Sequence, residues 1–167
     1  DIKATTIFNI QQCRFVVVRD KALRSEMRKL GNDQTQITDS SLLVIMTADM
    51  KAWQKDPSRY WVQAPKEVAD LLVGWMGPFH DGRDWLQRDE AQRSIGMAMQ
   101  TLMLAAKGIG LDSCPMIGFD IEAVAKLINL PADHVMGPMV AIGKGTKAPW
   151  PKPGQLSLEE VLVNNTF

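Results

Sequence analysis

The segment Gly108–Asp120, which reads Gly-Ile-Gly-Leu-Asp-Ser-Cys-Pro-Met-Ile-Gly-Phe-Asp, constrains the fold more than any other part of this chain. It follows the strongest helical pattern of the sequence, over Arg88–Lys107, where apolar residues repeat at the spacing of one helix face. Gly108 or Gly110 is expected to end that helix, and Asp112–Cys114 predicts a short strand. The loop after this strand delivers backbone N–H groups to the start of another helix, which suits a flat, electron-rich ligand.

The rest of the chain mixes strands and helices without a regular β-α-β repeat. Runs of β-branched and apolar residues predict buried strands at Arg14–Val18, Leu42–Thr47 and Met139–Ile142. Helices are predicted after the capping residues Asp20 and Asp120, and shorter helical elements at Pro65–Val73 and Leu158–Val163. The mixture favours an α+β fold over a doubly wound α/β fold. The length of 167 residues favours one domain over residues 1–167.

Charge and composition exclude several classes of function. Nineteen Lys and Arg residues balance nineteen Asp and Glu residues, so no net field attracts nucleic acid or an anionic membrane. No apolar run approaches the roughly 18 residues of a membrane-spanning helix. Cys13 and Cys114 form no CxxC pair, which favours a reduced, cytoplasmic protein. His80 and His134 are too few and too far apart in sequence to suggest a metal site.

One segment, Trp53–Arg83, combines three proline breaks with five of the eleven aromatic residues. We interpret it as an aromatic excursion that covers another part of the molecule. The ten Met residues of the chain fit soft core filling, and the alternative is an apolar pocket or a large subunit interface. On the strong helix, Gly96, Ala98 and Ala105 would let another backbone approach closely, which favours a homodimer.

No arrangement of side chains in the sequence supplies acid–base or nucleophilic chemistry. Gly108-Ile-Gly110 ends a helix, whereas a dinucleotide-binding fingerprint follows a strand and opens a helix. Cys114 has no histidine nearby in sequence and is expected to be a buried structural residue. Asp89 and Glu90 are expected to be capping and dipole residues at a helix start. The lack of acid–base and nucleophilic side chains indicates that a bound cofactor supplies the chemistry.

Several blocks of the sequence, in order, resemble the nitroreductase family of flavin enzymes. Thr5–Phe15 is similar to the family motif Pro-Ser-Ser-x-Asn-x-Gln-Pro-Trp-x-Phe, and Gly31–Ser41 is similar to the polar turn before the second core strand. Arg88–Asp120 resembles the central helix and the flavin loop. Gly143-Lys144 and Pro151–Leu156 resemble the stretch that brings a cation to the FMN phosphate. Each block alone is weakly specific, but together they span nearly the whole chain.

The resemblance implies a nitroreductase-like fold with a central mixed, mostly antiparallel sheet flanked by helices, and a homodimer with FMN at its interface. In the flavin loop, two backbone N–H groups would point near N5 and O4 of the ring. No catalytic side chain and no metal is implied. The cofactor-binding residues carried over are Thr6, Ile7 and Asn9 from one subunit, Asn32 from the other, Pro115, Met116, Ile117 and Gly118 in the loop over one ring face, and Lys152 at the phosphate.

The chain departs from the family pattern at its start. The family opens with Arg-x-Ser-x-Arg/Lys, which grips the phosphate and the flavin pyrimidine, and no residue before Thr5 matches it. We therefore expect this segment to be missing and FMN to bind weakly. Ile117 stands where Glu is frequent, although a backbone contact survives that change. Without the resemblance, Asn9 would be a turn residue, Asn32 a helix C-cap and Lys152 a solvated loop residue.

The expected function is that of an NAD(P)H-dependent flavin oxidoreductase. Hydride would pass from NADH or NADPH to FMN, and then to a nitroaromatic, quinone or similar small-molecule acceptor, in a ping-pong cycle. Two alternatives stay open: a truncated, cofactor-poor dimeric scaffold without activity, and dehalogenase or flavin-fragmenting chemistry on the same fold. Neither nucleic acid nor a membrane is an expected partner.

Overall fold

The computed structural model describes residues 4–167, so the first three residues of the predicted domain 1–167 lie outside the described range. The short 3₁₀ helices are labelled η. In chain order the elements are η1 (Ile7–Asn9), β1 (Cys13–Val18), α1 (Lys21–Leu30), α2 (Gln36–Asp39), β2 (Leu42–Asp49), η2 (Ala52–Gln54), η3 (Pro57–Tyr60), α3 (Lys66–His80), α4 (Asp84–Gly108), β3 (Asp112–Met116), α5 (Ile121–Leu127), β4 (His134–Gly143) and α6 (Leu158–Val161).

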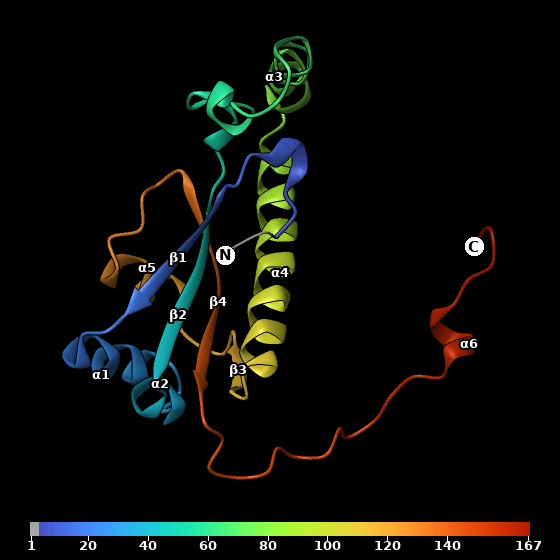
Figure 1. Cartoon of the computed structure of the whole chain (residues 1–167). Coiled ribbons are helices and arrows are strands. Elements are labelled where there is room, and N and C mark those ends of the chain that lie inside the picture. Colours follow the sequence, from blue (N-terminus) through green and yellow to red (C-terminus); the bar gives the residue numbers. More distant parts are fainter. Residues whose placement is uncertain (1–3) are drawn as a thin grey trace.

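The strands form a sheet in the order β1-β2-β4-β3, and each neighbouring pair is antiparallel (Figure 1). β2 and β4 are therefore the central strands, and β1 and β3 are the edges. Helices cover both faces of the sheet, so β2 is buried continuously from Leu43 to Asp49, as its unbroken apolar run predicted. This arrangement confirms the α+β prediction.

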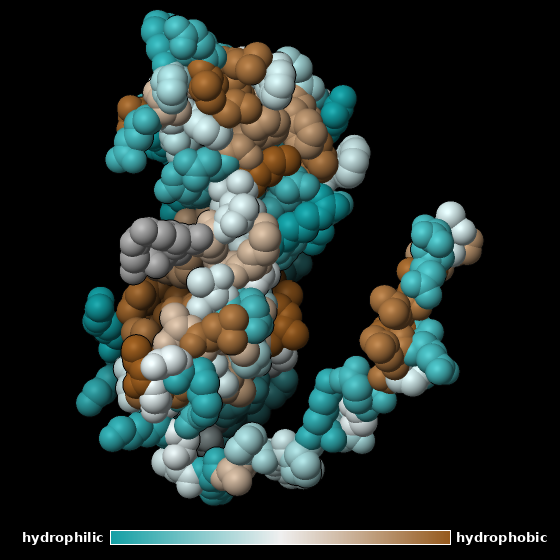
Figure 2. All heavy atoms as spheres, turned by 45° about the vertical axis from the view of Figure 1, so that its right-hand side comes forward, coloured by the Kyte–Doolittle hydropathy of each residue, from teal (hydrophilic) through white to brown (hydrophobic). Residues whose placement is uncertain are grey.

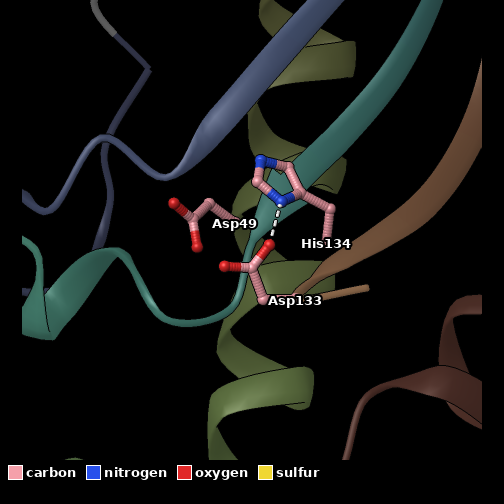
Figure 3. Close-up of side chains that lie close together, drawn as sticks. All are labelled: Asp49, Asp133 and His134. Atoms are coloured by element: carbon pink, nitrogen blue, oxygen red, sulfur yellow. Dashed lines mark hydrogen bonds and ion pairs between the residues drawn. The ribbon is translucent and has the colours of Figure 1, made fainter. Parts of the chain in front are cut away.

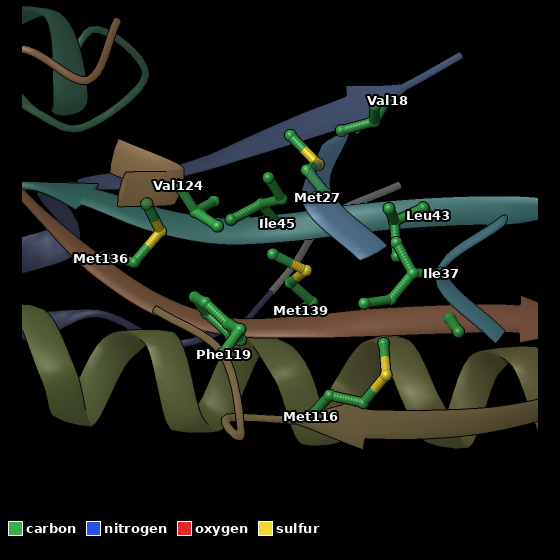
Figure 4. Packing of buried hydrophobic residues seen from close by; sticks show 11 residues of the cluster. Val18, Met27, Ile37, Leu43, Ile45, Met116, Phe119, Val124, Met136 and Met139 are labelled. Carbon is green, nitrogen blue, oxygen red and sulfur yellow. The ribbon is translucent and has the colours of Figure 1, made fainter. Parts of the chain in front are cut away.

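Successive side chains of the central strands point to opposite faces of the sheet and supply two separate cores. The first core lies beneath α1 and α5 (Figure 4) and contains these side chains of β2 and β4: Leu43, Ile45, Met139 and Ala141. The second core lies beneath α4 and contains the alternate ones: Val44, Met46, Val140 and Ile142. Met27, Met116 and Met136 join the first core, so methionine fills the interior here as its composition suggested.

The long helix α4 begins at Asp84 rather than at the predicted Arg88. Asp89 and Glu90 therefore lie inside the helix, Glu90 pairs with Arg93, and the capping role predicted for the two acids is wrong. The helix extends further because Leu86 is buried and holds the first turn against the fold. The helix lies close to the sheet at Gly137 of β4, where an added Cβ atom would lie 2.7 Å from Ile95 Cγ2.

Other element bounds also differ from the sequence prediction. β3 continues to Met116 and β4 begins at His134, because pairing between the two strands extends both beyond their apolar centres. The predicted caps are confirmed: Leu23 N donates to Asp20 Oδ1 at 2.7 Å, and Ala123 N donates to Asp120 Oδ1 at 2.9 Å. α5 ends at Leu127, two residues before the predicted Asn129.

The aromatic excursion packs around a small core of its own at one end of the sheet. Ile10, Ala52 and Met76 are its buried residues, and aromatic side chains pack against them: Phe8, Trp53, Tyr60 and Trp61. α3 runs to His80, beyond the predicted Val73, and contains Pro78. The proline removes one N–H donor near the end of the helix. Burial of Met76 and His80 holds this last turn in place.

Beyond β4 the chain leaves the body as an exposed C-terminal arm, residues 144–167, which ends in α6 (Figure 1). Ser157 begins α6 with a capping box that it shares with Glu160. Several apolar side chains of the arm are exposed, and Figure 2 shows them as a brown stretch apart from the body: Leu156, Leu158, Val161, Leu162 and Val163.

Candidate functional site

Two side-chain amides converge on one backbone carbonyl at the connection between β3 and α5. Asn32 Nδ2 donates to Gly118 O at 3.0 Å, and Gln34 Nε2 donates to the same oxygen at 3.1 Å. Gln34 Nε2 also donates to Gly31 O at 3.1 Å. Because two donors fix this carbonyl, the orientation of the loop around Gly118 is set by the turn that follows α1.

That turn has an unusual backbone. Gly31 is the C-cap of α1, and Asn32 follows it, so the predicted C-cap role of Asn32 is off by one residue. Asn32 and Asp33 have φ angles of 52° and 54°, in the left-handed region. The Arg28 side chain forms an ion pair with Asp33, at 2.6 Å between Nε and Oδ1. The Arg28 carbonyl also accepts a hydrogen bond from the Asp33 N–H at 3.1 Å. Such conformations cost of order 1–3 kcal/mol each and cluster at functional sites.

The strand register decides which way the loop donors face. Pro115 has no N–H, so the ladder bonds of β3 fall on Cys114 and Met116, which pair with Ala141 and Met139 of β4. The N–H of Ile117 therefore lies on the outer side of this edge strand. Neither the Ile117 nor the Gly118 N–H donates to any other residue that the structure describes. Two adjacent donors are thus free beside the fixed Gly118 carbonyl.

The predicted loop Pro115–Gly118 is shorter than expected. Pro115 and Met116 belong to β3, and the side chain of Met116 is buried in the first core. Ile117 is exposed, and Phe119 turns back into that core. Of the four predicted residues, Ile117 and Gly118 therefore form the exposed part of the connection.

A row of carboxamides continues along this surface, at Asn32, Gln34 and Gln36. Gln36 Nε2 donates to Gln34 Oε1 at 3.1 Å and lies 3.9 Å from Cys114 Sγ. The sequence prediction missed Gln34 and Gln36, although amide side chains at every second position were the available signal. A groove of about 270 Å³ lies beside them, and its lining includes Thr35, Gln36, Cys114 and Lys144.

Cys114 is exposed, so the prediction of a buried structural cysteine is wrong. β3 is an edge strand, and the Cys114 sulfur lies beside Gln36 of α2 at this edge. Cys13 is the more buried thiol, and burial raises its pKa to about 11.

A second group of predicted residues lies in η1. Asn9 Nδ2 donates to the Tyr60 carbonyl at 2.8 Å, and Thr6 Oγ1 accepts from the Gln11 N–H at 3.0 Å. Phe8, Asn9 and Gln11 have φ angles of 48°, 55° and 51°, so strain is concentrated here as well. A groove of about 280 Å³ lies beside Thr6 and includes Arg14.

The described chain does not bring the two groups together. Figure 1 shows η1 beside the α3 end of α4, whereas α1, α2 and β3 gather toward its opposite end. Lys152 lies on the C-terminal arm, where its ammonium group contacts Gln155 Oε1. The predicted cofactor-binding residues thus form three separate places on one chain, of which Asn32, Ile117 and Gly118 make a contiguous one.

An acidic cluster lies elsewhere, at the start of β4. Asp49, Asp133 and His134 offer ligand atoms within 4.8 Å of one another (Figure 3), and His134 Nδ1 lies 2.7 Å from Asp133 Oδ1. Lys55 Nζ bridges the two carboxylates, at 2.8 Å from Asp49 and 2.5 Å from Asp133. The lysine lowers the pKa of Asp133 to about 2. This cluster is therefore an ion-pair junction with its own cation.

Comparison with known proteins places the chain in a family. The Nitroreductase family model matches residues 3–144. Protein DrgA of Synechocystis is 57% identical over 166 residues, covering 96% of this chain and 79% of that protein. MhqN of Bacillus subtilis, assigned as an NAD(P)H nitroreductase, is 31% identical over 84% of this chain and 71% of its own length.

Solved structures agree with this assignment. An Exiguobacterium sibiricum protein, assigned to the nitroreductases and crystallised in complex with FMN, has a TM-score of 0.88. It is 23% identical, and the match covers 98% of this chain and 81% of that one. The fold is therefore nitroreductase-like, and the chain belongs to the nitroreductase family.

Proposed function

We propose that this chain is an FMN-dependent oxidoreductase that takes hydride from NADH or NADPH and reduces a nitroaromatic, quinone or similar acceptor in a ping-pong cycle. Membership of the nitroreductase family supports this activity. The observation that carries the proposal is the pair of free N–H groups at Ile117 and Gly118, set beside a carbonyl that Asn32 and Gln34 hold.

The residues of this site fit the polar edge of a flavin. That edge presents hydrogen-bond acceptors and one ring N–H donor, so it needs donors and an acceptor from the protein. Ile117 and Gly118 offer the donors through their backbone. Asn32 uses its Nδ2 on Gly118 and keeps Oδ1 for a donor. The sequence contains no dinucleotide-binding fingerprint, which favours FMN over the dinucleotide FAD.

Each of the chain's own groups then has a defined role. FMN supplies the hydride-accepting chemistry when it is bound. Ile117 and Gly118 N–H groups bind the ring edge, and Asn32 and Gln34 orient the loop that carries them. Lys152 neutralises phosphate charge. Pro115 and Met116 support the loop from β3, Met116 from within the core.

We propose further that the site is completed by a second copy of the chain. Thr6, Ile7 and Asn9 lie away from the Gly118 loop in the same chain, so their predicted contacts with the flavin ring and ribityl chain would come from the partner. The exposed apolar residues of the C-terminal arm support a large interface, since obligate dimers typically bury more than about 2,000 Å² of mostly apolar surface. The aromatic excursion would then cover the site and influence the choice of acceptor.

Three further observations concern the surroundings in which the protein acts. No helix within residues 4–167 is long and apolar enough to cross a membrane. Formal net charge is zero, which disfavours nucleic acid as a partner. Cys13 and Cys114 are free thiols, in keeping with the proposed reducing, cytoplasmic location.

Steady-state kinetics of FMN-loaded protein test this proposal. NADH or NADPH should be varied at several fixed concentrations of menadione or nitrofurazone as model acceptors. A ping-pong enzyme gives parallel double-reciprocal lines, and each donor should reduce the flavin in the absence of acceptor. Loaded protein that neither donor reduces would contradict the proposed activity and favour the scaffold alternative.

A further inference from the structure

A small cavity lies where the aromatic excursion meets the body of the protein. Its volume is about 10 Å³, and its walls include Gln12, Trp53, His80 and Glu90. These residues come from the segment before β1, from η2, from the end of α3 and from α4. Asp49, the last residue of β2, also lines the cavity, which therefore lies where five parts of the chain meet.

Two residues of the cavity wall each carry a buried polar atom that has no hydrogen-bond partner among the described residues. Gln12 is 4% exposed, and its Nε2 donates to Ser94 Oγ at 3.2 Å, but its Oε1 accepts nothing. Trp53 Nε1 is buried and donates to nothing. A buried polar group without a partner costs roughly 1–3 kcal/mol. One of these atoms is an acceptor and the other is a donor, so a single small molecule can satisfy both.

His80 offers a further acceptor in the same wall. Its Nδ1 lies 2.8 Å from the Met76 carbonyl oxygen. Its ring stacks on the Trp53 ring, with 5.4 Å between the ring centroids. Burial lowers the pKa of His80, so the ring is neutral near pH 7. With Nδ1–H donating to Met76, Nε2 is left as an acceptor.

We propose that this cavity binds one ordered water molecule, which accepts from Trp53 Nε1–H and donates to Gln12 Oε1. A cavity of roughly 10–15 Å³ holds a single water, and buried waters typically make about three hydrogen bonds. His80 Nε2 or the carboxylate of Glu90 receives the second donor bond of the water. The bound water fastens the aromatic excursion to the segment before β1. This inference does not depend on the proposed flavin chemistry.

A metal ion does not fit this cavity as well. The indole N–H of Trp53 is only a donor and repels a cation. The nearby carboxylate of Asp49 is already bonded to Lys55 Nζ at 2.8 Å and to the Lys51 N–H at 2.9 Å. The donor and acceptor pair in the wall matches water instead.

The direct test is NMR of the ¹⁵N-labelled full chain together with a high-resolution crystal structure. Indole signals are assigned with the variants Trp53→Phe and Trp61→Phe. Trp61 Nε1 is also buried without a partner, but Trp61 is not part of the cavity wall, so it is the matched control. We expect a cross-peak between the Trp53 indole proton and long-lived water, no such cross-peak for Trp61, and a water within hydrogen-bond distance of Trp53 Nε1 and Gln12 Oε1.

The thermal stability of the same variants gives an independent readout. If water bonds the Trp53 indole, Trp53→Phe strands that water and lowers Tm more than Trp61→Phe does. If Trp53 Nε1 has no hydrogen-bond partner at all, the substitution removes the free-energy cost of burying it. Trp53→Phe then lowers Tm no more than the control. A dry cavity in the crystal structure, or no water cross-peak at Trp53, would overturn the proposal.

Discussion

The side-chain amide of Asn32 donates to the carbonyl oxygen of Gly118 across 3.0 Å, although the two residues are 86 positions apart in the sequence. This bond links the strained turn after α1 to the loop after β3. The same carbonyl also accepts from Gln34, so two amides hold the loop, while the N–H groups of Ile117 and Gly118 have no partner among the described residues.

Removing the second amide should loosen this loop without unfolding the protein. We predict that Gln34→Leu weakens FMN binding by roughly 2- to 12-fold, since one hydrogen bond contributes about 0.5–1.5 kcal/mol net. Gln36→Leu is the control, because Gln36 bonds to Gln34 but not to Gly118. Fluorescence titration of FMN measures both variants. Equal losses in the two variants would mean that the Gly118 contact is not the cause.

The backbone donor at position 118 can be removed selectively. We predict that Gly118→Pro abolishes flavin reduction by NADH, because proline has no N–H and fixes φ. Gly118→Ala should retain activity, since a Cβ there meets its nearest atoms only at 3.7 and 3.8 Å, in Asn32 and Gln34. Ile117→Ala should also have little effect, because the inferred contact is made by the backbone. Stopped-flow absorbance measures the reduction. An active, flavin-loaded Gly118→Pro variant would show that this N–H does not contact the ring.

The two thiols should differ in reactivity. Cys114 is exposed and Cys13 has a pKa raised to about 11 by burial, and the thiolate is the reactive form. We predict one fast and one slow reaction with a disulfide reagent at pH 8, and loss of the fast phase in Cys114→Ser. That variant should keep its turnover with NADH. Loss of turnover with flavin still bound would indicate thiol chemistry.

The Lys55–Asp133 ion pair should make stability depend on pH in the acid range. The pKa of Asp133 is about 2, below the ordinary value of 3.8. The pair therefore stabilises the fold above about pH 4, and this contribution is lost as pH falls toward 2. We predict that Asp133→Asn removes part of the fall in the urea midpoint between pH 4 and pH 2. The effect should be modest because Asp133 is partly exposed.

The exposed pair Lys66–Asp70 within α3 supplies the control for this experiment. Asp70→Asn should leave the acid limb of the stability profile nearly as it is in the parent protein. A profile in Asp133→Asn that superimposes on the parent between pH 4 and pH 2 would contradict the assignment.

Local signals in the sequence were sufficient for most of the fold. The continuous burial of β2 and the caps Asp20 and Asp120 follow from patterns of neighbouring residues, so they are visible in the sequence. The extension of β3 to Met116 depends on pairing with β4. Likewise α3 passes through Pro78 because Met76 and His80 are buried by distant residues. Such tertiary contacts override local propensity.

The candidate site was only partly predictable for the same reason. Asn32, Ile117 and Gly118 were predicted through the family resemblance, and the structure shows that Asn32 bonds to the Gly118 carbonyl. Gln34 was missed because its contact with Gly118 spans 84 positions. Exposure of Cys114 depends on β3 being an edge strand, which only the strand order reveals.

Binding of FMN by the purified chain tests the central claim most directly. FMN should be titrated into the protein while flavin fluorescence and visible absorbance are recorded, with FAD and riboflavin titrated in parallel. The account predicts saturable binding of one FMN per chain, a changed flavin spectrum, and bleaching of that spectrum on anaerobic addition of NADH or NADPH. An unchanged FMN spectrum at saturating protein, with the fold intact by circular dichroism, would contradict it.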